Sequence, residues 1–317
     1  MTGTLRLAFL YPGQGAQPES PLPEMFPDMP ELPELYAKAA KPWTPAVESF
    51  SQRADCDELQ TQAGVLATGY ALGQMLRRRG VEPQAVAGYS SGIYTALAAS
   101  GAADPQDMAG IVRTAYTAIL DCCPEPSYRM LAVIGLDRRR VEQLLQRQRS
   151  PGWISLANNA TQVIVSLPET EAEAFSELSL QAGALRLIEL PFPRPYHAPP
   201  LEPAGQALAN RLTSLCLRTP TVPIMAGTEP HFLSSPEDIA ETVGEQLWSP
   251  VEWEQTVNRL LDSGIDGLVC LDPSGMLTRI VLWIARKVPV YGLANPRDAA
   301  RLLSEVPPVR RAAAGGP

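Results

Sequence analysis

Short apolar strands alternate with helices along most of the chain, and this alternation restricts the fold more than any other feature. Strands that alternate with helices favour a mostly parallel sheet covered by helices on both faces. We therefore predict an α/β fold whose large domain is built from residues 1–126 and 193–306. The expected elements are a strand at 5–11, a helix at 62–79, a strand at 85–89, helices at 238–247 and 253–263, a strand at 267–272 and a helix at 276–287.

The pattern changes between residues 127 and 192, where the elements follow the order βαββαβ. The run YRMLAVIGL is followed by a helix, the strand pair WISLANNATQVIVSL, a second helix and the strand ALRLIELP. This order is that of the ferredoxin-like split motif, which forms its own antiparallel sheet. We predict a small ferredoxin-like subdomain at 127–192, inserted into the large domain. Residues 307–317 (PPVRRAAAGGP) are expected to form a disordered tail.

Composition excludes several classes of function. The net charge of −8 disfavours broad binding to nucleic acid or to an anionic membrane. No apolar stretch reaches the roughly 20 residues of a membrane span, and the N-terminus has no cleavable signal pattern, so we expect a cytoplasmic protein. The five cysteines contain no CxxC pair. We therefore expect neither a disulfide framework nor a zinc site. Because the sequence also has no metal-ligand cluster and no dinucleotide fingerprint, we expect no metal and no bound cofactor.

The segment Gly88-Tyr89-Ser90-Ser91-Gly92 fits the pattern G-x-S-x-G between a predicted strand and a predicted helix. In such a nucleophile elbow, typical of α/β-hydrolase-like domains, a tight turn exposes the serine hydroxyl and the following helix N-terminus favours developing negative charge. A turn with a capping serine is the alternative interpretation. The strand-to-helix context favours Ser90 as a nucleophile.

A nucleophilic serine needs a base, and the chain has two histidines. His197 lies in the proline-bounded loop PFPRPYHAPPLEPA, which could hold an imidazole rigidly, whereas His231 lies in a sequence typical of an exposed turn. We therefore predict His197 as the base. The oxyanion formed on attack requires hydrogen-bond donors. The Ser91 backbone N–H is the expected first donor, and Gln14, in the PGQG turn, the second.

At this point the sequence resembles a known family. The segments YPGQGAQ, TQAGVLATGYAL, GYSSGIYTALAASGA, MLAVIGL, NNATQVIVS, the His197 loop and QLWSPVEW have the order and spacing found in malonyl-CoA:acyl-carrier-protein transacylases and in the acyltransferase domains of polyketide synthases. The resemblance extends to about Leu293. It implies that Ser90 is acylated, that His197 is the base and that Gln14 and Ser91 form the oxyanion hole. It also implies that the backbone carbonyl of Ser249 orients His197.

The sequence departs from this family at the acyl-binding positions. Tyr89 replaces the histidine of the malonyl-type elbow, and the position of the arginine that pairs with a malonyl carboxylate falls on Ala115. A buried carboxylate without a cationic partner costs several kcal/mol, so malonyl should be a poor substrate. Arg113 lies about 200° away around the helix axis and is expected to be exposed.

Two further residues, Tyr116 and Arg194, complete the predicted acyl-selectivity set of Tyr89, Ala115, Tyr116 and Arg194. Ala115 and Tyr116 leave room for a larger acyl group without a carboxylate. Arg194, three residues before His197, is expected either to contact a polar acyl group or the phosphopantetheine, or to be a surface charge.

Family members without the arginine include stand-alone enzymes that move aminoacyl or dipeptidyl groups between acyl carrier proteins in macrolactam polyketide pathways. The resemblance therefore implies ping-pong transfer of such a group, with an acyl carrier protein and a phosphopantetheine or coenzyme A thioester as partners. An ordinary malonyl-CoA:acyl-carrier-protein transacylase, an acyl thioester hydrolase and an inactive scaffold are the alternatives. Carrier proteins are acidic, and the candidate docking residues are Arg147, Arg149 and Arg297.

Overall fold

The chain is described by a computed structural model that covers residues 5–18, 20–48, 56–148 and 151–306. Arg149 and the predicted tail at 307–317 lie outside the described residues. A six-stranded sheet, sheet A, has the order β10-β9-β1-β2-β7-β8, and all its neighbouring strands are parallel except β7 and β8. Its strands are β1 (Leu7–Tyr11), β2 (Ala85–Gly88), β7 (Ile224–Met225), β8 (Phe232–Leu233), β9 (Gly267–Cys270) and β10 (Val290–Gly292). The predicted mostly parallel α/β fold is confirmed.

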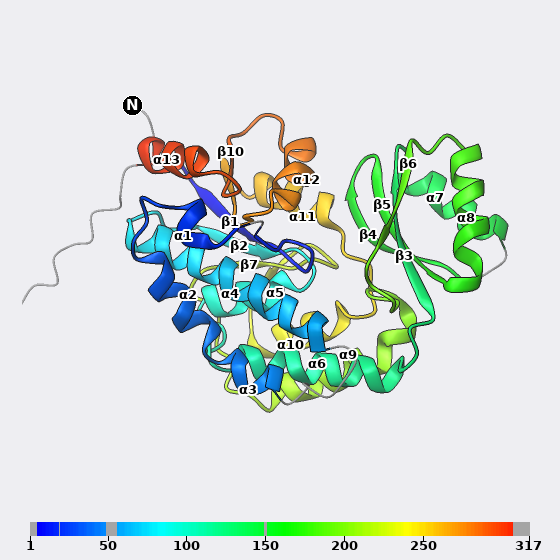
Figure 1. The fold of residues 1–317 in the computed structure, drawn as a ribbon, viewed down its shortest axis with the longest axis horizontal. Coiled ribbons are helices and arrows are strands. Elements are labelled where there is room, and N and C mark those ends of the chain that lie inside the picture. The colour runs from blue at the N-terminus through cyan, green and yellow to red at the C-terminus, as the bar shows by residue number, and fades with distance from the viewer. Residues whose placement is uncertain (1–4, 19, 49–55, 149–150, 307–317) are drawn as a thin grey trace, which may run out of the picture.

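Alternating side chains of β1 divide the core between the two faces of sheet A. Phe9 and Tyr11 pack in one apolar cluster, and Ala8 and Leu10 pack in the other. The first cluster is covered by α2 (Leu32–Ala40), α4 (Cys56–Arg78), α5 (Gly92–Ala99), α6 (Met108–Cys122), α9 (Glu202–Thr213), α10 (Pro236–Glu245) and α13 (Pro296–Glu305). The second is covered by α11 (Trp253–Asp262) and α12 (Met276–Ile284) (Figure 1).

A second, antiparallel sheet, sheet B, stands beside α11 and α12 (Figure 1). It consists of β3 (Tyr128–Ile134), β4 (Trp153–Asn159), β5 (Gln162–Pro168) and β6 (Arg186–Leu190), in the order β4-β5-β3-β6. The helices α7 (Arg138–Gln148) and α8 (Glu169–Gln181) cover its outer face. The chain thus follows the predicted βαββαβ order in this region. Whether residues 127–192 form an independent subdomain remains a prediction.

The proline-rich segment near the N-terminus is more regular than its composition suggests. Besides α2, it contains α1 (Leu22–Met25) and α3 (Trp43–Glu48). Both α1 and α2 carry proline in the first turn, where the missing N–H would have no helical partner. None of the helices in the described ranges is long and apolar enough to cross a membrane.

Candidate active site

Ser90 lies in a sharp turn between β2 and α5. Its φ of 53° is left-handed, a conformation that costs free energy for any residue with a side chain. The flanking glycines are required sterically, because a Cβ on Gly88 would lie 2.0 Å from the Ile93 nitrogen and one on Gly92 would lie 2.2 Å from the Tyr11 carbonyl oxygen. The sequence pattern G-x-S-x-G therefore forms a nucleophile elbow that presents the Ser90 hydroxyl at the carboxyl edge of sheet A.

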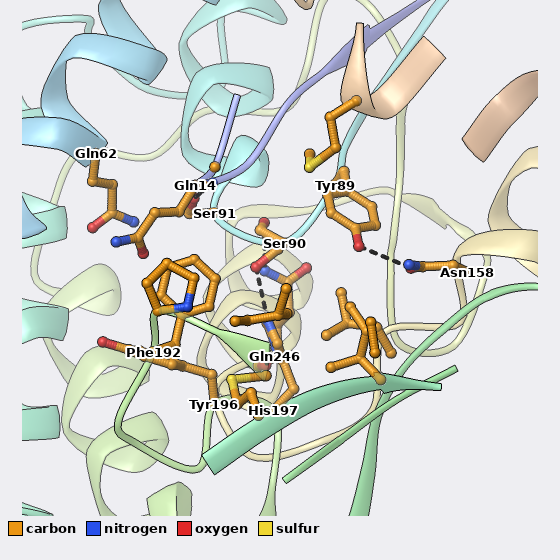
Figure 2. Close-up of a pocket in the computed structure, with 18 of the residues that line it drawn as sticks. Gln14, Gln62, Tyr89, Ser90, Ser91, Asn158, Phe192, Tyr196, His197 and Gln246 are labelled. Carbon is orange, nitrogen blue, oxygen red and sulfur yellow. Dashed lines mark hydrogen bonds between the residues drawn. The ribbon is translucent and has the colours of Figure 1, made fainter. Parts of the chain in front are cut away.

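His197 faces this hydroxyl, with 2.7 Å between the His197 Nε2 and the Ser90 Oγ (Figure 2). The His197 Nδ1 lies 2.6 Å from the backbone carbonyl oxygen of Gln246. A carbonyl oxygen can only accept, so Nδ1 carries the ring proton and Nε2 is the acceptor toward Ser90. His197 also has a left-handed φ of 59°, and its backbone N–H donates to the Leu247 carbonyl. The backbone around residues 246 and 247 thus fixes both the tautomer and the direction of the imidazole.

Burial keeps this imidazole neutral. Desolvation lowers the pKa of His197 from its ordinary value of 6.5 to about 4, although the hydrogen bond to the Gln246 carbonyl acts in the opposite direction. At neutral pH the ring is therefore able to accept the Ser90 proton. His231 has a different setting: it is largely exposed, and its ring contacts the Glu229 carbonyl and the Asp238 carboxylate.

The prediction that Ser249 orients His197 is wrong. The Ser249 hydroxyl donates to the Glu245 carboxylate, and the carbonyl that meets Nδ1 belongs to Gln246. Gln246 is the C-terminal cap of α10, where helix carbonyls lack an intrahelical partner. Its side chain also donates to the backbone oxygen of Ser90, at 2.9 Å. Gln246 therefore holds both members of the Ser90–His197 pair.

The two predicted oxyanion donors lie together beside Ser90. Parallel pairing brings Tyr11 of β1 opposite Gly88 of β2, so the turn after β1 adjoins the elbow. There the Gln14 backbone N–H donates to the Ser91 hydroxyl at 3.2 Å, and Ser91 caps the N-terminus of α5 (Figure 2). Two backbone N–H groups at a helix N-terminus favour a negative charge at this point.

A cavity of about 610 Å³ opens next to Ser90 and His197. One wall comes from α6 and another from the inner face of sheet B, and both are mostly apolar. The α6 wall consists of Val112, Ala115, Tyr116 and Ile119, and the sheet B wall includes Met130, Ala132, Leu156, Ile164, Ile188 and Leu190. Among the described residues that line the cavity, the one permanently charged side chain is Arg279, an exposed residue of α12.

The structure places the four predicted acyl-selectivity residues in two groups. Tyr89, Ala115 and Tyr116 line the cavity. Arg194 is absent from this lining; it is 2% exposed, and its Nε donates to the Cys123 carbonyl. Arg194 is therefore not a surface charge, and its contact with the acyl group or the phosphopantetheine remains a prediction. Arg113 is exposed and lies outside the cavity lining, as expected.

A carboxylate that sequence reasoning missed links several of these residues. The Glu58 Oε1 accepts from the Tyr196 hydroxyl at 2.8 Å and from the Gln14 Nε2 at 3.2 Å, and its Oε2 lies 3.9 Å from the Arg194 Nη1. Burial and the nearby Glu58 charge raise the pKa of the Tyr116 hydroxyl. Glu58 therefore organises one polar side of the cavity. It lies 44 residues from Gln14 and carries no local sequence signal.

Tyr89 joins the elbow to sheet B. Its hydroxyl donates to the Asn158 Oδ1 at 2.8 Å (Figure 2), and its ring packs edge-on against Trp253. Asn158 is 1% exposed and lines the cavity, and its Nδ2 has no hydrogen-bond partner within the described ranges. Tyr89 thus makes a buried polar contact beside the cavity.

We expect Tyr89→Phe to lower the free energy of unfolding by about 1–3 kcal/mol, because the buried Asn158 oxygen would lose its donor. Urea denaturation followed by circular dichroism measures this change. Tyr128→Phe is the matched control, since the Tyr128 hydroxyl has no hydrogen-bond partner in the described part of the chain. Equal stabilities of the two variants would contradict a net contribution from the Tyr89–Asn158 bond.

The predicted carrier-binding arginines that the structure describes, Arg147 and Arg297, are both exposed. Arg147 is exposed on α7, behind sheet B, and Arg297 is exposed at the start of α13 (Figure 1). Neither residue lines the cavity. Their role in carrier binding remains a prediction.

Comparison with known proteins gives consistent matches. Residues 52–291 match a family described as the acyl transferase domain. The chain is 28% identical over 298 residues to the malonyl CoA-acyl carrier protein transacylase of Bacillus subtilis, and the alignment covers 92% of this chain and 94% of that protein. It is 27% identical over 305 residues to the protein of the same name from Escherichia coli K12, and the alignment covers 94% of this chain and 99% of that protein. The crystal structure of an acyl-carrier-protein S-malonyltransferase from Burkholderia pseudomallei superposes with a TM-score of 0.84 at 25% identity, covering 95% of this chain and 100% of that one.

Proposed function

Because this chain belongs to the acyl transferase domain family, we propose that it transfers an aminoacyl or dipeptidyl group between acyl carrier proteins of a macrolactam-type polyketide pathway. Ser90 is the acylated nucleophile in this proposal, and His197 is the general base. The substrate brings its own phosphopantetheine, so no resident cofactor is involved.

The proposed reaction has two half-reactions. In the first, the Ser90 oxygen attacks the thioester carbonyl while the His197 Nε2 accepts the hydroxyl proton. The Gln14 and Ser91 N–H groups stabilise the oxyanion, the C–S bond breaks, and the imidazolium returns the proton to the leaving thiolate. In the second, the thiol of another carrier gives its proton to His197 and attacks the Ser90 ester, which releases the new thioester and restores the Ser90 hydroxyl. The half-reactions are mirror images, so the same groups serve both.

The α6 wall of the cavity is the observation that most supports a substrate without a free carboxylate. Ala115 is 3% exposed and lines the cavity at the position where the resemblance places a carboxylate-binding arginine. Arg279, the cation of the described lining, is exposed on α12 rather than buried in the α6 wall. A malonyl carboxylate in the α6 wall would therefore be desolvated without a counter-charge.

Asn158 supports an acyl group that contains an amide. In the described part of the chain its buried Nδ2, in the cavity wall, has no hydrogen-bond partner, and leaving such a donor unsatisfied costs free energy. The amide carbonyl of a dipeptidyl thioester would accept this hydrogen bond.

Malonyl transfer is the second candidate, and the names of the relatives favour it. The two functions are separated by intact-protein mass spectrometry after mixing the enzyme with malonyl-CoA, acetyl-CoA or an aminoacyl-loaded carrier protein. We expect the aminoacyl mass on Ser90 and little malonyl mass. Efficient malonyl labelling would replace our proposal with the malonyl transferase function. Rapid loss of the label without a carrier thiol would instead indicate a hydrolase.

Ala115→Arg should raise malonyl labelling of Ser90 by roughly 10- to 100-fold, because a charge-assisted pair with the carboxylate contributes about 1.5–3 kcal/mol. Aminoacyl labelling should fall, since the arginine fills part of the cavity. Initial rates of labelling by malonyl-CoA and by the aminoacyl carrier measure both effects. Ala115→Met is the control for volume without charge. If it raised malonyl labelling equally, the charge argument would fail.

A further inference from the structure

An exposed, cationic and partly apolar surface lies at the mouth of the catalytic cavity. We call it the α12 surface and define it as Arg279, Leu282, Trp283, Arg286 and Lys287. Trp283 is 62% exposed and Leu282 is 51% exposed, which is unusual for side chains of this size. Arg279 and Trp283 also line the cavity, so the surface continues directly into the site.

The charges of the α12 surface are not neutralised by neighbouring carboxylates. Within the described ranges, neither arginine nor Lys287 forms an ion pair, and the Arg286 guanidinium lies 5.0 Å from the centre of the Trp283 ring. This arrangement holds the arginine over the aromatic face and leaves its charge available. The chain as a whole is acidic, with a net charge of −8, so these three cations form a local positive surface on it.

We infer that the α12 surface docks the acyl carrier protein, an inference that rests on the proposed function. An acidic carrier complements the three cations, and the exposed Trp283 and Leu282 suit the apolar centre that protein interfaces require. A carrier seated here would deliver its phosphopantetheine past Arg279 into the cavity. Arg279 and Trp283 line the cavity together with residues of sheet B, whereas Arg147 and Arg297 do not line it.

The test compares one acyl group on three donors: a phosphopantetheinylated carrier protein, coenzyme A and pantetheine. We expect Arg286→Glu and Leu282→Glu each to raise KM for the carrier-bound donor by roughly tenfold, with an effect that shrinks at high salt. Neither residue lines the cavity, so the rate with the pantetheine donor should stay at the wild-type value. Arg211→Glu is the matched control, because Arg211 is an exposed arginine of α9 on the opposite face of sheet A.

Several results would overturn the inference. An unchanged KM for the carrier-bound donor in both Arg286→Glu and Leu282→Glu would do so. An equal rise in KM for the coenzyme A donor would also do so, because it would indicate that the surface binds phosphate rather than the carrier protein. A higher KM for the carrier-bound donor in Arg147→Glu but not in Arg286→Glu would place the docking surface on α7. Calorimetric titration of the unacylated holo-carrier is independent of the acyl group. If no aminoacyl thioester labels Ser90 but Arg286→Glu still weakens holo-carrier binding, the proposed substrate is wrong and the docking inference stands.

Discussion

Replacing Ser90 with alanine should eliminate the acyl-enzyme and lower the rate of acyl transfer by roughly 10⁴- to 10⁶-fold. The Ser90 hydroxyl is the group that His197 contacts, at 2.7 Å, and the elbow directs it toward the cavity. Alanine keeps the left-handed turn but offers no oxygen to form an ester. Intact-protein mass spectrometry after incubation with the acyl donor measures the covalent step directly.

Ser91→Ala is the control for this variant. It removes the neighbouring hydroxyl, which accepts from the Gln14 N–H, but keeps the Ser91 backbone N–H. The acyl mass should therefore still form in Ser91→Ala. Labelling of Ser90→Ala at the wild-type level would show that another residue is acylated, and the proposed mechanism would be abandoned.

The parts of the site predicted from sequence are those with a local signal. The glycines of the elbow are dictated by backbone contacts within a few residues, and the parallel pairing of β1 with β2 follows from the strand and helix pattern. His197 could be predicted because the chain has only two histidines and a rigid loop holds one of them. These features need no knowledge of distant contacts.

The parts that were missed depend on long-range packing. Several carbonyls at the end of α10 lack a helical partner, and the turn after the helix decides that Gln246 rather than Ser249 faces His197. Glu58 and Asn158 reach the cavity region from segments far from the elbow, and although Asn158 begins the segment NNATQVIVS, no local pattern indicates a role in the site for either residue. Arg194 would be expected at a surface by residue type, but its backbone and carboxylate contacts hold it inside.

The proline-rich segment that contains α1 and α2 shows that composition alone is a poor guide to local structure. Proline breaks a helix in its interior, yet it is favourable in the first turn, where its fixed φ suits the helix. The prolines of α1 and α2 occupy that position. Position within the helix, rather than abundance, therefore decides what these prolines do.

Replacing His197 with alanine should slow acylation of Ser90 by roughly 10³- to 10⁴-fold, because no other group would accept the serine proton. Rapid-quench measurement of a single acylation turnover isolates this step. His231→Ala is the matched control and should retain its acylation rate, since His231 contacts Asp238 and neither residue lines the cavity.

The pH profile of the same step tests whether the buried imidazole is neutral at physiological pH. Burial lowers the pKa of His197 to about 4, so the basic form dominates above that pH and is lost as the pH falls through it. The acylation rate of the wild-type enzyme should therefore stay level from about pH 8 to 5.5 and decline only near pH 4. A decline centred near 6.5 would mean that the ring is solvated before the substrate binds. The Gln246 carbonyl would then orient a histidine whose pKa burial has not lowered, and exclusion of water would have to come from the bound acyl group.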